Sequence, residues 1–116
     1  KKSINGSKVL ILGLAYKKNI DDTRESPSVE LIELLSAKGA RVDYSDPNVA
    51  TFPKMRKHNF DMDSVKLTGS RLESYDCVIL ATDHDDFDYK TILKHSDLII
   101  DTRGKFPITR KNVVRA

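Results

Sequence analysis

A short apolar run, followed by a long charged loop and the start of a helix, most constrains the fold of this chain. Lys8-Val-Leu-Ile-Leu-Gly13 is aliphatic, which is typical of a strand buried on both faces. Ser26-Pro27 then supplies an N-cap serine and a proline suited to the first helical turn. Leucines at helical spacing and a glycine placed to end the helix follow, namely Leu31, Leu34, Leu35 and Gly39. This stretch therefore predicts one strand–loop–helix unit.

The loop between that strand and that helix is about twice the ~2–6 residues usual for such a connection. It carries the cations Lys17, Lys18 and Arg24. In an open α/β sheet, ligands bind beyond the carboxyl ends of the strands, close to the N–H groups and positive dipole of a helix N-terminus. An anion site would explain the length and charge. The loop residues alone equally allow a solvated loop whose cations pair with Asp21, Asp22 and Glu25.

The rest of the chain alternates short apolar strands with helices. A second strand is predicted over Arg41–Asp46, whereas residues 48–63 show no clean periodicity. The remaining predicted elements are a short strand at Val65–Thr68, a helical turn at Leu72–Tyr75, a strand at Cys77–Ala81, a helix at Tyr89–Lys94 and a strand at Leu98–Asp101. This alternation predicts an α/β fold with a Rossmann-like, doubly wound parallel sheet in three α/β/α layers. Residues 1–116 are expected to form a single domain.

Parallel strands make a further prediction about which residues meet. The segments that follow the strands should gather at one edge of the sheet: Tyr16 to Arg24, Asp46, Thr82 to Phe87, and Thr102-Arg103. Two groups of basic residues, far apart in the sequence, would then face one crevice. Such a crevice could hold a diphosphate nucleotide.

Composition excludes several functional classes. The chain has 116 residues, 39% of them hydrophobic and 32% charged, which fits one globular domain that is too small for a two-substrate oxidoreductase. The apolar runs are too short to span a bilayer, and the basic residues lack the aromatic interleaving of nucleic-acid binders, so neither a membrane nor nucleic acid is expected as a partner. A single cysteine and the lack of a signal peptide favour a cytoplasmic location. The opening Lys1-Lys2 indicates a fragment excised from a longer protein.

Three other residues have a structural interpretation. Cys77 lies inside an apolar strand and is expected to be a small core residue. His84 is flanked by acids, but their spacing matches no metal-ligand pattern, so a polar loop over the sheet edge is predicted. Asp46 is expected to cap the turn before Pro47. No metal site or catalytic residue is predicted in this chain.

The glycine fingerprint of dinucleotide-binding domains is missing. Gly13-Leu-Ala-Tyr-Lys17 supplies one glycine, whereas Gly-x-Gly-x-x-Gly needs three for the turn, the approach of the pyrophosphate and helix packing. The side chains of Tyr16 and Lys17 would crowd a pyrophosphate bound in the usual pose. The fold is therefore predicted to be Rossmann-like without being a main NAD-binding domain.

Four segments resemble one enzyme family, in order and across nearly the whole chain. They are Gly13-Leu-Ala-Tyr-Lys-Lys-Asn-Ile-Asp-Asp-Thr-Arg-Glu-Ser-Pro-Ser28, Tyr44-Ser-Asp-Pro47, Asp76-Cys-Val-Ile-Leu-Ala-Thr-Asp-His-Asp-Asp-Phe87 and Ile99-Ile-Asp-Thr-Arg103. The first segment is long enough to be specific. Together they resemble the C-terminal, UDP-binding domain of the UDP-glucose/GDP-mannose dehydrogenase family, the nucleotide-sugar 6-dehydrogenases.

The resemblance implies a function and roles for individual residues. Members of the family oxidise the C6 alcohol of a nucleotide sugar to a carboxylate with NAD, and NAD is held mainly by an N-terminal domain. Tyr16, Lys17 and Arg103 fall at positions that bind the UDP-sugar, and Arg24 falls on the arginine that reaches NAD across a domain interface. The catalytic-cysteine motif of the family is absent here, so this fragment alone is expected to be inactive. The implied partners are UDP-sugar, NAD and the missing N-terminal and central domains, in a homo-oligomeric parent.

The substrate and the catalytic status stay open at this point. Asn19-Ile-Asp-Asp22 and Thr82-Asp-His84 look more like the UDP-N-acetylhexosamine dehydrogenases than the UDP-glucose enzymes. UDP-N-acetylglucosamine or UDP-N-acetylmannosamine is therefore favoured over UDP-glucose, in a pathway that supplies polysaccharide precursors. The alternative is a non-catalytic nucleotide-binding or regulatory α/β domain. Without the resemblance, Lys17 would be read as a solvated lysine and Arg103 as a salt-bridge partner of Asp101.

Overall fold

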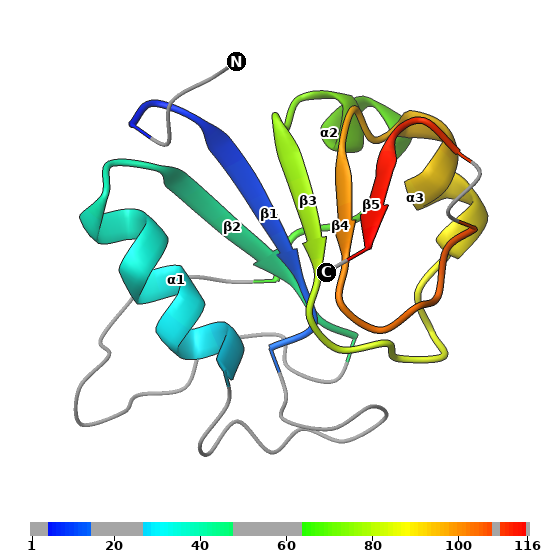
Figure 1. Cartoon of the computed structure of the whole chain (residues 1–116), viewed down its shortest axis with the longest axis horizontal. Helices are drawn as coiled ribbons and strands as arrows, with labels where there is room; N and C mark the ends of the chain where they lie inside the picture. The colour runs from blue at the N-terminus through cyan, green and yellow to red at the C-terminus, as the bar shows by residue number, and fades with distance from the viewer. Residues whose placement is uncertain (1–4, 15–26, 48–63, 108–109, 116) are drawn as a thin grey trace.

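A computed structural model describes residues 5–14, 27–47, 64–107 and 110–115, and these residues form a parallel sheet with helices on both faces (Figure 1). The strand order is β2-β1-β3-β4-β5, and every neighbouring pair is parallel. The strands are β1 Lys8–Leu12, β2 Arg41–Ser45, β3 Cys77–Leu80, β4 Ile99–Asp101 and β5 Val113–Arg115. The helices are α1 Pro27–Ala37, α2 Gly69–Glu73 and α3 Tyr89–His95. The predicted Rossmann-like α/β fold is confirmed.

The side chains of β1 separate the two halves of the core. Because successive strand residues point to opposite faces, Val9 and Ile11 pack with Ile32 of α1 on one side of the sheet. Leu10 and Leu12 pack on the other side, in a cluster that also takes its members from α2, α3 and the segments beside them, including Leu72 and Ile92. Figure 1 shows α1 on one side of the sheet and α2 and α3 on the other. The predicted three-layer arrangement is therefore also confirmed.

The strand order places a switch point between β1 and β3. The chain leaves β1 through α1 to reach β2 on one side, and it leaves β3 through α3 to reach β4 on the other. Connections that diverge in this way open a crevice at the carboxyl ends of the two central strands, where ligands of doubly wound proteins bind. The fold thus directs attention to the chain beyond Leu12 and Leu80.

The helix boundaries follow their capping residues. Gly39, at φ +92°, ends α1 as predicted, in a conformation that side chains other than glycine rarely adopt. Hydrogen bonds from Thr91 stabilise the ionised form of Asp88, the N-cap of α3, and lower the pKa of that carboxyl. Leu34 of α1 is 55% exposed, so the prediction that it lies on the apolar face of the helix is wrong; among the described side chains of α1, Ile32 is fully buried.

The segment before β3 differs from its prediction. No strand forms over Val65–Thr68, because only Val65 donates a backbone hydrogen bond to β2, at Tyr44 O (2.9 Å). The chain then turns into α2 at Thr68, whose hydroxyl accepts from Arg71 N and caps the helix. The helix consequently begins three residues before the predicted start at Leu72.

Cys77 is a potentially reactive residue in β3. Burial raises the pKa of the Cys77 thiol to about 11, so the thiol is protonated at neutral pH and a poor nucleophile, in line with its predicted structural role.

Among the described residues, no helix has the length and apolar character needed to cross a membrane.

Candidate functional site

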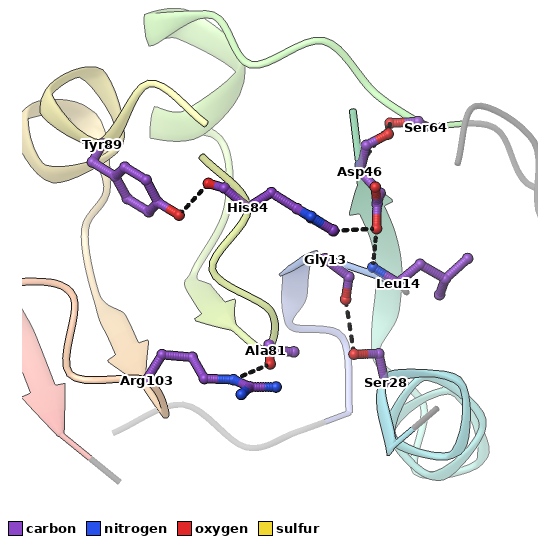
Figure 2. Close-up of polar contacts among 9 residues, drawn as sticks. All are labelled: Gly13, Leu14, Ser28, Asp46, Ser64, Ala81, His84, Tyr89 and Arg103. Atoms are coloured by element: carbon purple, nitrogen blue, oxygen red, sulfur yellow. Dashed lines mark hydrogen bonds and ion pairs between the residues drawn. The ribbon is translucent and has the colours of Figure 1, made fainter. Parts of the chain in front are cut away.

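The carboxyl ends of the central strands bring four separate segments together, as their predicted parallel arrangement requires (Figure 2). Gly13 and Leu14 follow β1, Asp46 follows β2, His84 belongs to the segment after β3, and Arg103 follows β4. Leu14 and His84 are both hydrogen-bonded to Asp46, and Arg103 donates to Ala81 O in the segment after β3. The predicted convergence of Asp46, the segment from Thr82 and Arg103 at one edge is therefore confirmed.

Gly13 makes the turn by which the chain leaves β1. Its φ is +94°, and an added Cβ would lie 2.5 Å from Thr82 Cβ and 2.8 Å from both Thr82 N and Thr82 O. Its N–H donates to Ser45 O (2.8 Å), and its carbonyl accepts from the hydroxyl of Ser28 in the first turn of α1 (2.8 Å; Figure 2). The end of β1 is thus fixed against β2, against α1 and against the segment after β3.

Asp46 contributes a buried carboxylate to this edge. Its side-chain oxygen Oδ2 accepts from the backbone N–H of Leu14 (2.7 Å) and from His84 Nε2 (3.0 Å), and the residue is only 2% exposed. A buried carboxylate needs such donors, because an unpaired buried charge is costly. The predicted cap on the turn before Pro47 leads into residues outside the described part of the chain and stays a prediction; the contacts of Oδ2 show that the Asp46 side chain also joins the end of β1 to the segment after β3.

His84 lies in the loop over the sheet edge, as predicted, and its side chain is buried there. It is 0% exposed, and its ring packs against Phe87 with centroids 5.6 Å apart. Its carbonyl accepts from the hydroxyl of Tyr89, whose pKa burial raises, so that this group remains a proton donor. An ionised carboxylate only accepts hydrogen bonds, so with Asp46 ionised the donor of this contact is Nε2 of His84. No group of three metal-ligating side chains occurs in the described part of the chain.

Asp101 organises the turn that carries Arg103. Oδ1 of Asp101 accepts from Arg103 N (2.9 Å) and Gly104 N (2.8 Å), and Oδ2 accepts from Phe106 N (2.8 Å). The carboxylate is fully buried. Its partners are backbone N–H groups, so the alternative interpretation of a simple side-chain salt bridge with Arg103 is wrong. The turn, and with it the position of Arg103 Cα, is held by three hydrogen bonds to one carboxylate.

The guanidinium of Arg103 extends from the end of β4 across the end of β3 (Figure 2). Nε donates to Ala81 O at 2.9 Å, which fixes the plane of the guanidinium. Within the described residues, the two terminal amino groups of Arg103 donate to no other protein group, and the side chain is exposed. A planar cation anchored in this way presents its remaining N–H groups to a phosphate or carboxylate.

The other predicted site residues, Tyr16, Lys17 and Arg24, lie outside the described residues. Their place in the sequence is nevertheless informative, because the segment that contains them begins directly after Leu14, at the same edge as Arg103. The edge therefore holds one described exposed arginine beside the start of a segment that the sequence makes rich in cations.

Comparison with known proteins identifies the family. A family model described as "UDP-glucose/GDP-mannose dehydrogenase family, UDP binding domain" matches residues 10–107. The chain belongs to this family.

Individual members of this dehydrogenase family agree with the match. A UDP-N-acetyl-D-mannosamine dehydrogenase of Methanococcus maripaludis is 34% identical over 98% of this chain, and a UDP-glucose 6-dehydrogenase of Rhizobium meliloti is 31% identical over 96%. The crystal structure of an NDP-N-acetyl-D-galactosaminuronic acid dehydrogenase from Methanosarcina mazei superimposes with a TM-score of 0.73 and 26% identity over 99% of this chain. In each comparison the chain spans 25% of the length of the other protein.

One feature of the site was not predicted from the sequence, namely the buried Asp46–His84 pair. The two residues are separated by 38 positions, and each was assigned on its own to a loop. A usable signal existed, since both residues follow strands that were predicted to be parallel, and an acid and a histidine at one sheet edge can pair. The sequence did not indicate that both side chains are buried.

Proposed function

We propose that this chain is the UDP-sugar-binding domain of an NAD-dependent nucleotide-sugar 6-dehydrogenase, which oxidises the C6 alcohol of the sugar to a uronic acid. The match of residues 10–107 to the UDP-binding domain of the family carries the proposal. In this proposal Arg103, Lys17 and Tyr16 bind the nucleotide sugar, and the rest of the parent chain supplies the catalytic residues. The isolated domain would then be inactive.

The geometry of the sheet edge supports the proposed binding role. A nucleotide diphosphate at the switch point would meet the anchored guanidinium of Arg103 on one side and the loop after Leu14 on the other. Arginine suits this role, because its planar fork can donate two parallel hydrogen bonds to phosphate oxygens. These residues would bind and orient the substrate, whereas the hydride transfer itself would occur elsewhere.

The same geometry argues against NAD binding at the usual Rossmann position of this domain. Gly13 stands at the first glycine of the dinucleotide fingerprint, which makes the turn, whereas Ala15 and Lys18 stand where the glycines for the pyrophosphate and for helix packing would be. The acid at the end of β2, which in such folds holds a ribose, is Asp46, and it is buried against Leu14 and His84. NAD would therefore be bound mainly by another domain of the parent, with Arg24 as the contribution of this chain.

The names of the relatives guide the choice of substrate. UDP-N-acetylmannosamine and UDP-N-acetylglucosamine are the first sugars to test, because several similar proteins are named UDP-N-acetyl-D-mannosamine dehydrogenases. UDP-glucose is next, in view of the UDP-glucose 6-dehydrogenases among the relatives. A cytoplasmic enzyme that makes precursors of polysaccharides would fit either substrate. A non-catalytic regulatory domain is the alternative, and a parent protein that produces no NADH with any of these sugars would favour it.

The proposal is tested on the full-length protein through Arg103. Wild-type protein mixed with NAD and each UDP-sugar should form NADH. Arg103→Ala should raise the KM for the UDP-sugar about 10- to 150-fold, which corresponds to ~1.5–3 kcal/mol for a lost charge-assisted hydrogen bond. Arg103→Lys should restore only part of the affinity, because a point charge cannot reproduce the fork. Wild-type KM in both variants would show that Arg103 is structural.

A second experiment separates the two ends of the charged loop. Lys17 and Arg24 are seven residues apart in the sequence, and a chain of that length can reach more than about 15 Å at ~3.3 Å per residue. We expect Lys17→Ala to weaken chiefly the UDP-sugar and Arg24→Ala to weaken chiefly NAD. The measurement is the KM for each ligand in each variant of the full-length protein. Equal effects on one ligand would mean that the cations form a single phosphate site.

A further inference from the structure

We propose that Asp46 and His84 form a positioning pair, which fixes the backbone of Leu14, where the charged loop begins, and the segment after β3 that anchors Arg103 for the UDP-sugar. The inference rests on the proposed function for the ligand that is positioned. It assigns a role to two residues that neither touch that ligand nor belong to the predicted binding set.

The contacts of Asp46 show how the pair acts on the backbone. One oxygen, Oδ2, receives both the N–H of Leu14 (2.7 Å) and His84 Nε2 (3.0 Å), so the two donors converge on a single point (Figure 2). Ser64 secures the Asp46 backbone at its other end, because the Ser64 hydroxyl accepts from Asp46 N at 2.9 Å. The backbone that carries the carboxylate is therefore held as well. The position of the carboxylate in turn determines where Leu14 N can lie.

The location of Leu14 makes this contact relevant to binding rather than only to folding. Leu14 is the last described residue after β1, and Tyr16 and Lys17 follow it by two and three positions. The pair therefore fixes the point at which the chain enters the charged loop. A misplacement of ~1 Å can cost about 100-fold in an enzyme, so an anchor at this point has a functional consequence.

The pair also links the two sides of the proposed site. Ala81, three residues before His84 in the same segment, supplies the carbonyl that accepts from Arg103 Nε (2.9 Å). Thr82, between them, packs against Gly13. The segment from Ala81 to His84 thus contacts Arg103 at one end and, through Asp46, the start of the charged loop at the other. Tyr89 holds this segment in place through the carbonyl of His84.

A matched pair of substitutions at His84 separates positioning from simple packing. The amide nitrogen of glutamine can occupy the place of Nε2 and donate to Asp46, whereas the amide of asparagine is one methylene shorter and stops near the place of Nδ1. Both substitutes are neutral and polar, so His84→Gln and His84→Asn differ chiefly in whether the hydrogen bond to Asp46 survives.

The control for a general loss of stability is Tyr75→Phe. The hydroxyl of Tyr75 donates to Asp43 Oδ2, and Tyr75 immediately precedes Asp76 and β3, at the opposite end of the strands from the site. This variant removes a hydrogen bond from a buried side chain without touching the edge that holds Leu14. It should lower the melting temperature and leave ligand binding unchanged.

The measurement is the KM for the UDP-sugar and kcat of the full-length protein, together with the melting temperature of each variant. We expect His84→Asn to raise KM about 10- to 100-fold with a smaller change in kcat, His84→Gln to remain near wild type, and Tyr75→Phe to keep the wild-type KM. A wild-type KM in His84→Asn, or equal KM increases in the asparagine and glutamine variants, would overturn the proposal.

Hydrogen exchange distinguishes failure of this inference from failure of the proposed function. If wild-type protein oxidises no UDP-sugar, the proposed function fails, yet the Leu14 amide can still report on the pair. Faster exchange of that amide in His84→Asn than in His84→Gln would show that the pair fixes the Leu14 backbone, even though the proposed ligand is wrong. Equal exchange in the two variants would show that the pair does not fix the Leu14 backbone.

Discussion

Asp101→Ala is expected to lower the free energy of unfolding by more than about 3 kcal/mol, because each buried N–H that loses its acceptor costs ~1–3 kcal/mol. Three backbone N–H groups, those of Arg103, Gly104 and Phe106, donate to this one carboxylate, which is 0% exposed. Water cannot easily replace the lost acceptor at a site closed on all sides. The measurement is urea unfolding of the 116-residue chain.

Asp101→Asn tests the same arrangement more finely. An amide has one acceptor oxygen, so it can serve either the Arg103–Gly104 side or Phe106, and its NH2 group must face an N–H on the other side. We expect an intermediate loss of stability. Asp97→Ala, at an exposed acid before the same strand, is the matched control and should change stability by no more than about 0.5 kcal/mol. An Asp101→Ala variant as stable as this control would contradict the assigned role.

The central part of the fold could be predicted because the signals for it are local. Aliphatic runs identified β1, β3 and β4, and the alternation with helices gave their parallel direction. Gly39 indicated the end of α1. A strand buried on both faces has a composition that few other elements share, so its prediction needs no knowledge of its neighbours.

Elements at the margin of the sheet could not be predicted in the same way. β5 has three residues, and two of them, Val114 and Arg115, are exposed, so it shows neither an apolar run nor a regular alternation. It is a strand only because Val113 and its neighbours pair with β4. Val65–Thr68 is the opposite case, with the composition of a strand but without the ladder of backbone hydrogen bonds that would make it one.

The position of the site could be predicted from the sequence, but the hydrogen bonds within the site could not. Parallel topology correctly brought Asp46, the segment after β3 and Arg103 to one edge. It did not show which polar side chains face inward there. Asp46 was assigned to the turn before Pro47 and His84 to a polar loop over the sheet edge, and only the structure shows that both side chains are buried and pair. Long-range polar contacts of this kind leave no periodic trace in the sequence.

Gly13→Ala should destabilise the 116-residue chain by about 2–5 kcal/mol, the sum of a backbone cost of ~1–2 kcal/mol at positive φ and an overpacking cost of ~1–3 kcal/mol. The added methyl would lie 2.5 Å from Thr82 Cβ and 2.8 Å from Thr82 N and O. Two of these three atoms belong to the backbone that follows β3, so Thr82→Ser should not rescue the variant, and the ends of β1 and β3 would have to separate.

Gly6→Ala provides the matched control for that experiment. Gly6 has a similar φ of +85°, but nothing lies within 4 Å of the place its Cβ would occupy. It therefore carries the conformational cost alone, and the difference between the two variants in urea unfolding measures the close approach of β1 to Thr82. If both variants lose the same stability, the segment after β3 yields to the methyl group, and Gly13 is required only for its backbone angle. A larger loss in Gly13→Ala would show instead that the edge between β1 and β3, where the proposed nucleotide site lies, is closed to even one extra carbon.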